Sequence, residues 1–313
     1  IPVVGWRQRT SSQSILLHAR MAETGGWTPE NLTVEAGQPL HIGLTSDDVT
    51  HSFAIGQSDQ PPVDIHPGEI TEVTLVFNEP GKYTFYCTRW CSVNHWRMRG
   101  TIEVTGPATA TKTVQPPLYV ALGLDIDSEH HAVILPAQIP SALRGSAFSQ
   151  SVPAAYRNHI YYLTHTPLEL WQALRAEPTL QNRSDLELWD VVAWVWQSNA
   201  TTQERNEGQQ LYATNCAACH GEQGQGNGVF ADELAQPAVG EHSGMASGEM
   251  TTRPADFTAA EHMLAASPAH LQGKIIRGGM GTGMPYLGPI FTDQQTWALV
   301  AYLWTFQFEL EEP

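Results

Sequence analysis

The period of the hydrophobic pattern changes part-way along the chain, from the two-residue period of strands to the longer period of helices. Between about residues 12 and 105, short runs alternate apolar and polar residues. In "EITEVTLVF", for example, Val73, Leu75 and Phe77 share one face. Turn-forming stretches such as "NEPGKY" separate these runs. Short strands at this spacing predict a Greek-key β-sandwich over residues 1–105.

The stretch "TGPATATKTVQPP" interrupts the alternation, because it is rich in Pro, Thr and Ala and has no period. It predicts a linker over residues 106–117. After it, apolar residues recur at helical spacing, and "SDLELWDVVAWVWQS" opens with a capping box in which Ser184 precedes Glu187 by three residues. The predicted fold is therefore multidomain, with an all-β sandwich followed by all-α domains over 118–200 and 201–313.

Two tryptophan-bearing stretches of the helical half are similar to each other. "SDLELWDVVAWVW" (184–196) aligns with "TDQQTWALVAYLW" (292–304) at a constant offset of 108, so that Trp196 matches Trp304. Upstream of them, "TPLELWQAL" aligns with "SPAHLQGKI". Two interpretations of residues 118–200 stay open. The segment is a degenerate copy of the C-terminal domain, or it is a helical spacer whose amphipathic helices are alike because periodicity fixes such positions.

Composition and charge narrow the function classes. The 313 residues carry a net charge of −16, which excludes a nucleic-acid partner because such a partner requires a basic surface. The acidic balance predicts either docking to a basic partner or simply a well-solvated surface. No apolar run reaches the roughly 18 residues that predict a membrane span. The N-terminal stretch lacks a signal-peptide pattern, and a chain beginning with Ile1 is expected to be processed or trimmed.

The four cysteines lie in two short-range pairs, Cys87 with Cys91 and Cys216 with Cys219. Disulfides in exported proteins join distant segments, whereas two such local pairs would constrain very little of the chain. The spacing therefore favours cofactor chemistry over structural cross-linking.

The first pair belongs to "CTRWCSVNHWRM", which also holds a histidine and a methionine. A thioether is a soft copper ligand and a poor zinc ligand, so Met98 favours copper over zinc. A one-copper electron-transfer site uses a single cysteine, and this stretch has two. Two thiolates bridging two coppers would use all the ligands, provided that a second histidine joins His95. His51 in "DDVTHSFAI" is the candidate, and a Cys87–Cys91 disulfide remains the alternative in an oxidised, metal-free protein.

"THSF" followed by "CTRWCSVNHWRMRG" resembles the binuclear CuA domain of cytochrome c oxidase subunit II and of the C-terminus of nitrous oxide reductase. The resemblance covers about residues 14–105 and implies a cupredoxin fold. It departs from the oxidase family in lacking that family's aromatic run before the first copper-domain strands. Position by position, it implies two copper ions bound by the bridging thiolates of Cys87 and Cys91, the imidazoles of His51 and His95, the thioether of Met98 and the backbone carbonyl of Arg89.

The second cysteine pair lies in "CAACH", the C-x-x-C-H motif that attaches c-type haem covalently through two thioethers. His220 would bind the iron on one side, and a methionine from a later loop would complete the coordination. Met280 and Met284 are the candidates, and Met284 is favoured because Pro285 stiffens the loop beside it. With "GMPYLGPIFTDQQTWALVAYLW", the region 203–308 resembles class I cytochromes c, which implies one haem bound through Cys216, Cys219 and His220.

The two clusters predict an electron-transfer protein that passes electrons between a periplasmic donor and a terminal reductase or oxidase, similar to cytochrome c oxidase subunit II. A freestanding periplasmic carrier or adaptor and a catalytic nitrogen-oxide reductase component are the alternatives. No substrate site is evident, because protein groups fill every ligand position. The expected partners are a cytochrome c-like or cupredoxin donor and an oxidase or reductase acceptor. The expected location is the periplasm or the outer face of the bacterial cytoplasmic membrane, with membrane contact only through an anchor or partner outside this chain.

Overall fold

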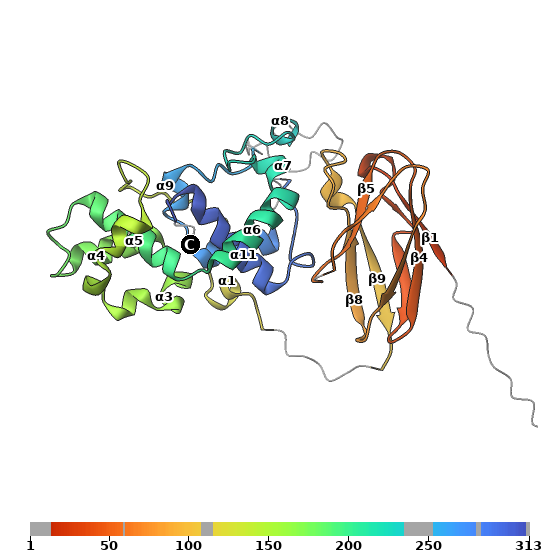
Figure 1. Cartoon of the computed structure of the whole chain (residues 1–313), viewed down its shortest axis with the longest axis horizontal. Helices are drawn as coiled ribbons and strands as arrows, with labels where there is room; N and C mark the ends of the chain where they lie inside the picture. The colour runs from red at the N-terminus through yellow and green to blue at the C-terminus, as the bar shows by residue number, and fades with distance from the viewer. Residues whose placement is uncertain (1–13, 59, 108–114, 235–252, 280–282, 311–313) are drawn as a thin grey trace, which may run out of the picture. The chain divides into compact units, whose positions relative to one another are not determined.

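A computed structural model describes residues 14–58, 60–107, 115–234, 253–279 and 283–310. The chain divides into two compact units, Ile1–Thr113 and Val114–Pro313. Strands make up the first unit and helices the second, as Figure 1 shows. The predicted fold class, an all-β sandwich followed by helices, is confirmed. Among the described residues, no helix is both long enough and apolar enough to cross a bilayer.

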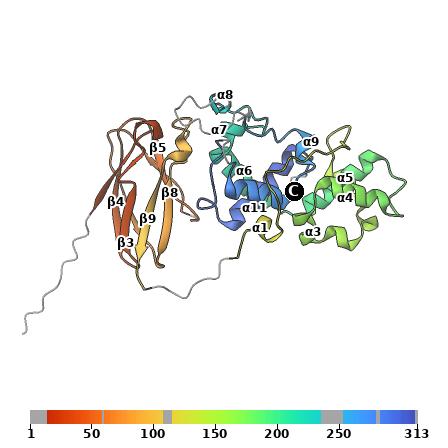
Figure 2. The same cartoon turned by 180° about the vertical axis from the view of Figure 1, so that it is seen from behind.

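The first unit is a sandwich of two sheets. Figures 1 and 2 show β1 and β4 in one layer and β5, β8 and β9 in the other. Strand order is β2-β1-β4-β7 in one sheet and β3-β9-β8-β5-β6 in the other. The described strands are β1 (Ile15–Ala19), β2 (Trp27–Thr28), β3 (Asn31–Glu35), β4 (Pro39–Ser46), β5 (His51–Ile55), β6 (Val63–Ile65), β7 (Thr71–Val76), β8 (Gly81–Tyr86) and β9 (Arg99–Thr105).

Three aromatic side chains form the centre of the sandwich core. Trp27 meets Phe53 and Phe85 edge-on, with ring centroids 6.0 and 5.4 Å apart. Val73 and Leu75, on the inward face that the alternation predicts, pack against this core. Strand β8 pairs with β5 on one side and with β9 on the other. The chain leaves β8, begins β5 and enters β9 at the same end of the sheet, so the residues at these three points lie close together.

The second unit is helical. Its described helices are α1 (Leu118–Ala121), α2 (Ala142–Ser146), α3 (His159–Thr164), α4 (Pro167–Ala176), α5 (Asp185–Ser198), α6 (Thr202–Asn215), α7 (Ala217–His220), α8 (Ala231–Leu234), α9 (Ala260–Met263), α10 (Pro268–Arg277) and α11 (Asp293–Leu303). Short 3-10 turns accompany them, including η4 (Ala154–Arg157) and η5 (Trp304–Phe306). The capping box predicted at Ser184 and Glu187 is confirmed, since each residue's side chain bonds the other's backbone N–H.

Residues 118–200 pack together with the helices that follow them. Within this unit α2 packs on α5 and α6 packs on α11. Trp196 of α5 meets Trp304, with ring centroids 5.7 Å apart, and Asp127 pairs with Lys274 and Arg277 of α10. The boundary near residue 200 that the sequence predicts therefore falls inside a single compact unit. The predicted linker 106–117 lies largely outside the described residues.

We expect the close approach at Gly100 to be essential for the sandwich. A Cβ there would lie 2.1 Å from the ring of Phe85 and 2.5 Å from the carbonyl oxygen of Glu30. Gly100→Ala should therefore lower the free energy of unfolding by about 1–3 kcal/mol, as overpacking does. Gly81→Ala is the control, because its Cβ would meet only Tyr83, at 3.7 Å. Urea unfolding measures both, and equal stability of the two variants would contradict this packing.

Candidate metal centre and haem site

The stretch from Cys87 to Met98 is a loop whose two ends are fastened together. Cys87 follows β8 directly, and Met98 directly precedes β9. The Cys87 N–H donates to the Met98 carbonyl at 3.1 Å, which continues the pairing of β8 with β9 past the strand ends. Because strand pairing fixes both ends, the side chains within the loop are held over the end of β5, where His51 begins that strand.

Sulfur, nitrogen and oxygen donors converge in this loop. The Sγ atoms of Cys87 and Cys91 and a ring nitrogen of His51 all lie within 4.8 Å of one another. Met98 Sδ lies 3.4 Å from Cys91 Sγ, and the Arg89 carbonyl oxygen lies 3.5 Å from Cys87 Sγ. All four cysteines of the chain are free thiols, so no disulfide competes for these sulfurs. Two thiols, an imidazole, a thioether and a carbonyl form a donor set suited to copper.

Asp48 fixes the orientation of the His51 ring. Its carboxylate accepts a hydrogen bond from His51 Nε2 at 2.6 Å and from the backbone N–H groups of Met21 and Val49 at 2.7 and 2.6 Å. The other ring nitrogen, Nδ1, therefore points toward Cys87 Sγ, 3.9 Å away. A carboxylate behind a ligating histidine is the usual second partner of a metal site, because it selects the tautomer and makes the imidazole more basic.

The pKa values of Cys87 and Cys91 shift in opposite directions. The hydrogen bond from Cys91, helped by His51, lowers the pKa of Cys87 to about 4 despite its burial, and the same bond raises the pKa of Cys91. Burial alone would lower the pKa of His51, but its bonds to Cys87 and Asp48 raise it. The loop therefore stabilises negative charge on sulfur beside imidazole nitrogen, which is the electrostatic setting that a bound cation requires.

His95 is the second histidine that the sequence predicts as a copper ligand. It begins the 3-10 turn His95–Arg97, is only 7% exposed, and its burial lowers the pKa of its ring. Its nitrogens do not belong to the group that lies within 4.8 Å, although its titration responds to the charge on Cys87. The structure thus brings His51, Cys87, Cys91, Met98 and the Arg89 carbonyl together, and His95 is not part of the group within 4.8 Å.

The "CAACH" motif forms one tight turn at the end of α6. The backbone N–H groups of Cys219 and His220 donate to the Cys216 carbonyl at 3.1 and 2.9 Å, so α7 and its N-cap Cys216 present both thiols and the imidazole from a single turn. Burial raises the pKa of Cys216 to about 12 and that of Cys219 to about 11, which keeps both as thiols. Such a turn is the arrangement that two thioether bonds to one porphyrin edge require.

A backbone carbonyl sets the tautomer of His220. Its Nδ1–H donates to the Ala255 carbonyl at 3.0 Å, and the ring stacks on Phe257 with centroids 4.6 Å apart. Burial lowers the pKa of the ring. Neutral imidazole with Nε2 directed away from this bond is the form that binds iron.

Of the two methionine candidates for the iron, the structure describes only Met284. Met280 lies outside the described residues. Met284 is half-buried, and its carbonyl accepts from the Gly279 N–H at 3.2 Å, which turns the loop back toward the end of α10. Gly278 has φ +72°, and a Cβ there would lie within 2.7 Å of the Met284 and Pro285 carbonyls. The loop thus depends on a glycine beside Met284, while the role of Met284 as iron ligand stays a prediction.

Two residues of these sites were not predicted from the sequence. Asp48 precedes His51 by three positions, and an Asp-x-x-His spacing in a loop before a strand is the signal that points to it. The Ala255 carbonyl gives no signal, because any residue can supply a backbone oxygen.

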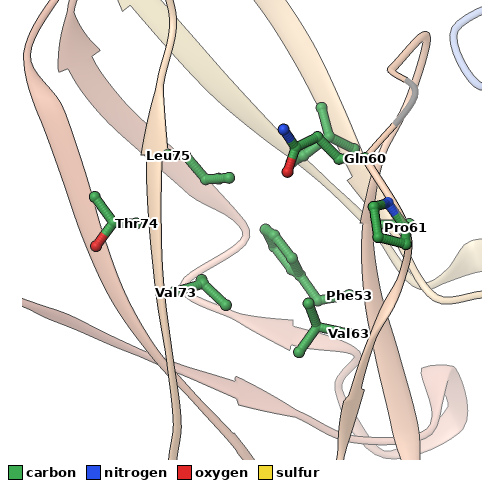
Figure 3. Close-up of a pocket in the computed structure, with 9 residues that line it drawn as sticks. Phe53, Gln60, Pro61, Val63, Val73, Thr74 and Leu75 are labelled. Carbon is green, nitrogen blue, oxygen red and sulfur yellow. The ribbon is translucent and has the colours of Figure 1, made fainter.

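A separate pocket in the sandwich carries no titratable group. Figure 3 shows Phe53, Val63, Val73 and Leu75 directed into it, with Gln60 and Pro61 at its side. Its lining is completed by Ala54, Ile55 and Thr74. The pocket includes none of the predicted copper ligands.

Comparisons with known proteins match the two parts of the chain that hold these candidate sites. Residues 19–105 match the family "Cytochrome C oxidase subunit II, periplasmic domain", and residues 206–307 match the cytochrome c family. The β-sandwich with its cysteine loop is therefore a cupredoxin domain of the CuA class. The chain carries this cytochrome c oxidase subunit II-type domain at its N-terminal end and a cytochrome c domain at its C-terminal end, a combination that implies copper and haem.

Individual relatives match the copper domain. A cytochrome c oxidase subunit 2 of Thermus thermophilus is 34% identical over 79 residues, which is 25% of this chain and 58% of the relative. The nitrous-oxide reductase of Ralstonia nicotianae is 32% identical over 75 residues, 23% of this chain and 12% of that protein. The periplasmic domain of subunit II of cytochrome oxidase from Bradyrhizobium japonicum is 18% identical, with a TM-score of 0.26 over 29% of this chain and 83% of that one. The chain therefore spans little more than half of the Thermus relative.

We expect Asp48→Ala to weaken copper binding about 10- to 100-fold, the usual effect of removing the partner of a ligating histidine. The His51 ring would lose the acceptor that fixes its tautomer. Asp47→Ala is a matched control, because Asp47 pairs with His18 and Arg20 instead. Competition with a copper chelator measures the affinity, and similar losses in both variants would show that Asp48 acts only through its charge.

Met284→Ala should abolish the sulfur-to-iron charge-transfer absorption of the haem while leaving the haem covalently attached through Cys216 and Cys219. The control Tyr286→Ala alters an exposed side chain of the same loop and should retain this absorption. Visible spectra of the purified variants decide the outcome. Loss of the band in Met280→Ala but not in Met284→Ala would assign the iron ligand to Met280.

Proposed function

We propose that this protein transfers electrons between a binuclear copper centre in its first unit and a single covalent haem in its second. The observation that carries the proposal is the convergence of Cys87, Cys91 and His51 within 4.8 Å, with Asp48 orienting the imidazole. Two cysteines at one site exceed the need of a one-copper centre, and both lie where they can bridge two ions.

The ligand set proposed for copper is the one that the resemblance to CuA domains implies. Cys87, Cys91, His51 and His95 would hold the two ions, and the convergence of Cys87, Cys91 and His51 supports three of these four ligands. Met98, beside Cys91, and the Arg89 carbonyl, beside Cys87, complete the set as weak ligands.

The second unit is proposed to hold one haem through Cys216, Cys219 and His220, with Met284 as the other iron ligand. When bound, copper and haem supply reversible one-electron exchange. The chain's own residues position both groups: Asp48 orients His51, the Ala255 carbonyl orients His220, and Cys87 is buried. Since protein donors fill the coordination positions, we infer electron transfer in place of substrate turnover.

The setting we propose is that of an oxidase subunit II, receiving electrons from a periplasmic cytochrome c-like or cupredoxin donor and passing them to a terminal oxidase or reductase. The family match over residues 19–105 and the relatives' names support this role on the periplasmic side of the membrane. A freestanding periplasmic carrier is the second candidate. Recovery of the protein in complex with a catalytic oxidase subunit would select the first role, and recovery only as a free protein would select the second.

Metal analysis of the intact protein should give two copper ions and one iron per chain. Electron paramagnetic resonance of the oxidised protein should show one electron shared by two copper nuclei. Cys87→Ser should abolish that signal and leave the haem spectrum intact, while Cys219→Ser should do the reverse, because the two sites lie in separate units. One copper per chain, or zinc in its place, would disprove the binuclear centre.

A further inference from the structure

The helices between residues 140 and 200 repeat the arrangement of the cytochrome c domain. α4 and α10 each have ten residues, begin with Pro and are capped by a hydroxyl side chain, Thr166 or Ser267. α5 and α11 both begin with Asp after a hydroxyl-bearing residue that closes a capping box. The first two helices start 101 positions apart and the second two 108. The copies therefore differ by only seven residues between these helices, in the loop that carries Met284.

In each copy, two helices also cross in close contact at a glycine. A Cβ on Gly145 of α2 would lie 1.9 Å from the carbonyl oxygen of Asp190 in α5. A Cβ on Gly208 of α6 would lie 2.0 Å from the carbonyl oxygen of Ala298 in α11. Asp190 and Ala298 are 108 positions apart, the offset between α5 and α11. The glycines therefore mark equivalent crossings, and they lie 63 positions apart.

The same offset of 63 identifies the counterpart of the haem motif. α7 (Ala217–His220) lies 63 positions after the 3-10 turn η4 (Ala154–Arg157), and the two turns begin and end at matching residues. The sequence "PAAYR" (153–157) thus stands where the second copy has "CAACH" (216–220). Pro, Tyr and Arg replace the two attaching cysteines and the iron-binding histidine, and the Tyr156 hydroxyl donates to Glu177 at 2.8 Å.

The contacts between the copies are reciprocal. Trp196 and Trp304 are equivalent by the offset of 108, and they pack against each other with centroids 5.7 Å apart. Residues that meet their own equivalents lie at a two-fold axis.

A backbone bond also joins the beginning of the first copy to the end of the second. The Ala142 N–H donates to the Glu309 carbonyl at 3.0 Å.

We propose that residues 141–200 are a second cytochrome c fold that has lost its haem site, and that it pairs with the haem-bearing copy as a two-fold dimer fused within one chain. The surface of the haem-bearing copy around Trp304 and Phe308 is accordingly an interface for a copy of its own fold. Trp196 occupies it, with its ring 6.2 Å from that of Phe308. The first copy holds no haem and serves as a permanent partner.

Chance similarity of amphipathic helices does not account for these features. Periodicity explains recurring tryptophans, but it does not place a glycine against an equivalent carbonyl in both copies or match a turn to a haem motif at the same offset.

Alanine substitution of the two glycines tests the proposal, because the direction of the change in stability differs between a free helix and a helix crossing. Gly→Ala in an unconstrained helix raises stability, whereas a Cβ at a crossing lowers it. Gly145→Ala and Gly208→Ala should both lower the thermal midpoint of the holoprotein by roughly 5 °C, measured by circular dichroism. The neighbouring exposed positions Ser146→Ala and Gln210→Ala are the matched controls and should leave it unchanged. A midpoint raised by Gly145→Ala would overturn the proposal.

The two-fold pairing is tested at its axis. If Trp196 and Trp304 form one reciprocal contact, the double variant with both residues replaced by alanine should lower the midpoint by less than the sum of the single variants. Additive losses would overturn the pairing. In an experimental structure, one rotation close to 180° should superpose η4, α4 and α5 on α7, α10 and α11. A requirement for different rotations would overturn the repeat, whatever the copper and haem contents prove to be.

Discussion

The pairing of β8 with both β5 and β9 is the constraint on which the proposed copper ligands depend. It sets Cys87, Met98 and the start of β5 at one end of a sheet, so a twelve-residue loop acquires fixed ends. Gly100 at the start of β9 permits this strand to lie close to Phe85 and the Glu30 carbonyl, which occupy the space that a side chain would need. The ligand geometry is thus a product of the sandwich core, in which Phe85 packs against Trp27 and Phe53.

In both candidate sites, a hydrogen bond to the histidine's other ring nitrogen holds the ring in place. Asp48 holds one histidine and is itself held by two backbone N–H groups, so its carboxylate has little freedom to turn. At the haem motif, a backbone carbonyl performs the same task for His220. In each case the outer partner selects which ring nitrogen faces the metal before any metal is present, which reduces the ordering required when it binds.

The features predicted from the sequence are those encoded locally. Strand alternation, the capping box at Ser184 and the spacing of the cysteine motifs each need only a few neighbouring residues, and the fold class followed from them. Asp48 was missed because its role depends on how the loop before β5 turns back. The packing of residues 118–200 into the helical unit depends on contacts such as Trp196 with Trp304, which no local pattern encodes. "PAAYR" carries none of the chemistry that marks "CAACH", so only matched helix positions identify it.

The contact between Trp196 and Trp304 has a consequence for how the haem-bearing copy behaves in a cell. Two separate cytochromes would associate or part according to their abundance, by mass action. Copies in one chain meet at an effective concentration that the short connection between α5 and α6 fixes, and dilution does not change it. On the proposed pairing, the C-terminal copy therefore keeps its tryptophan face covered at every expression level, and that face is withheld from other apolar partners.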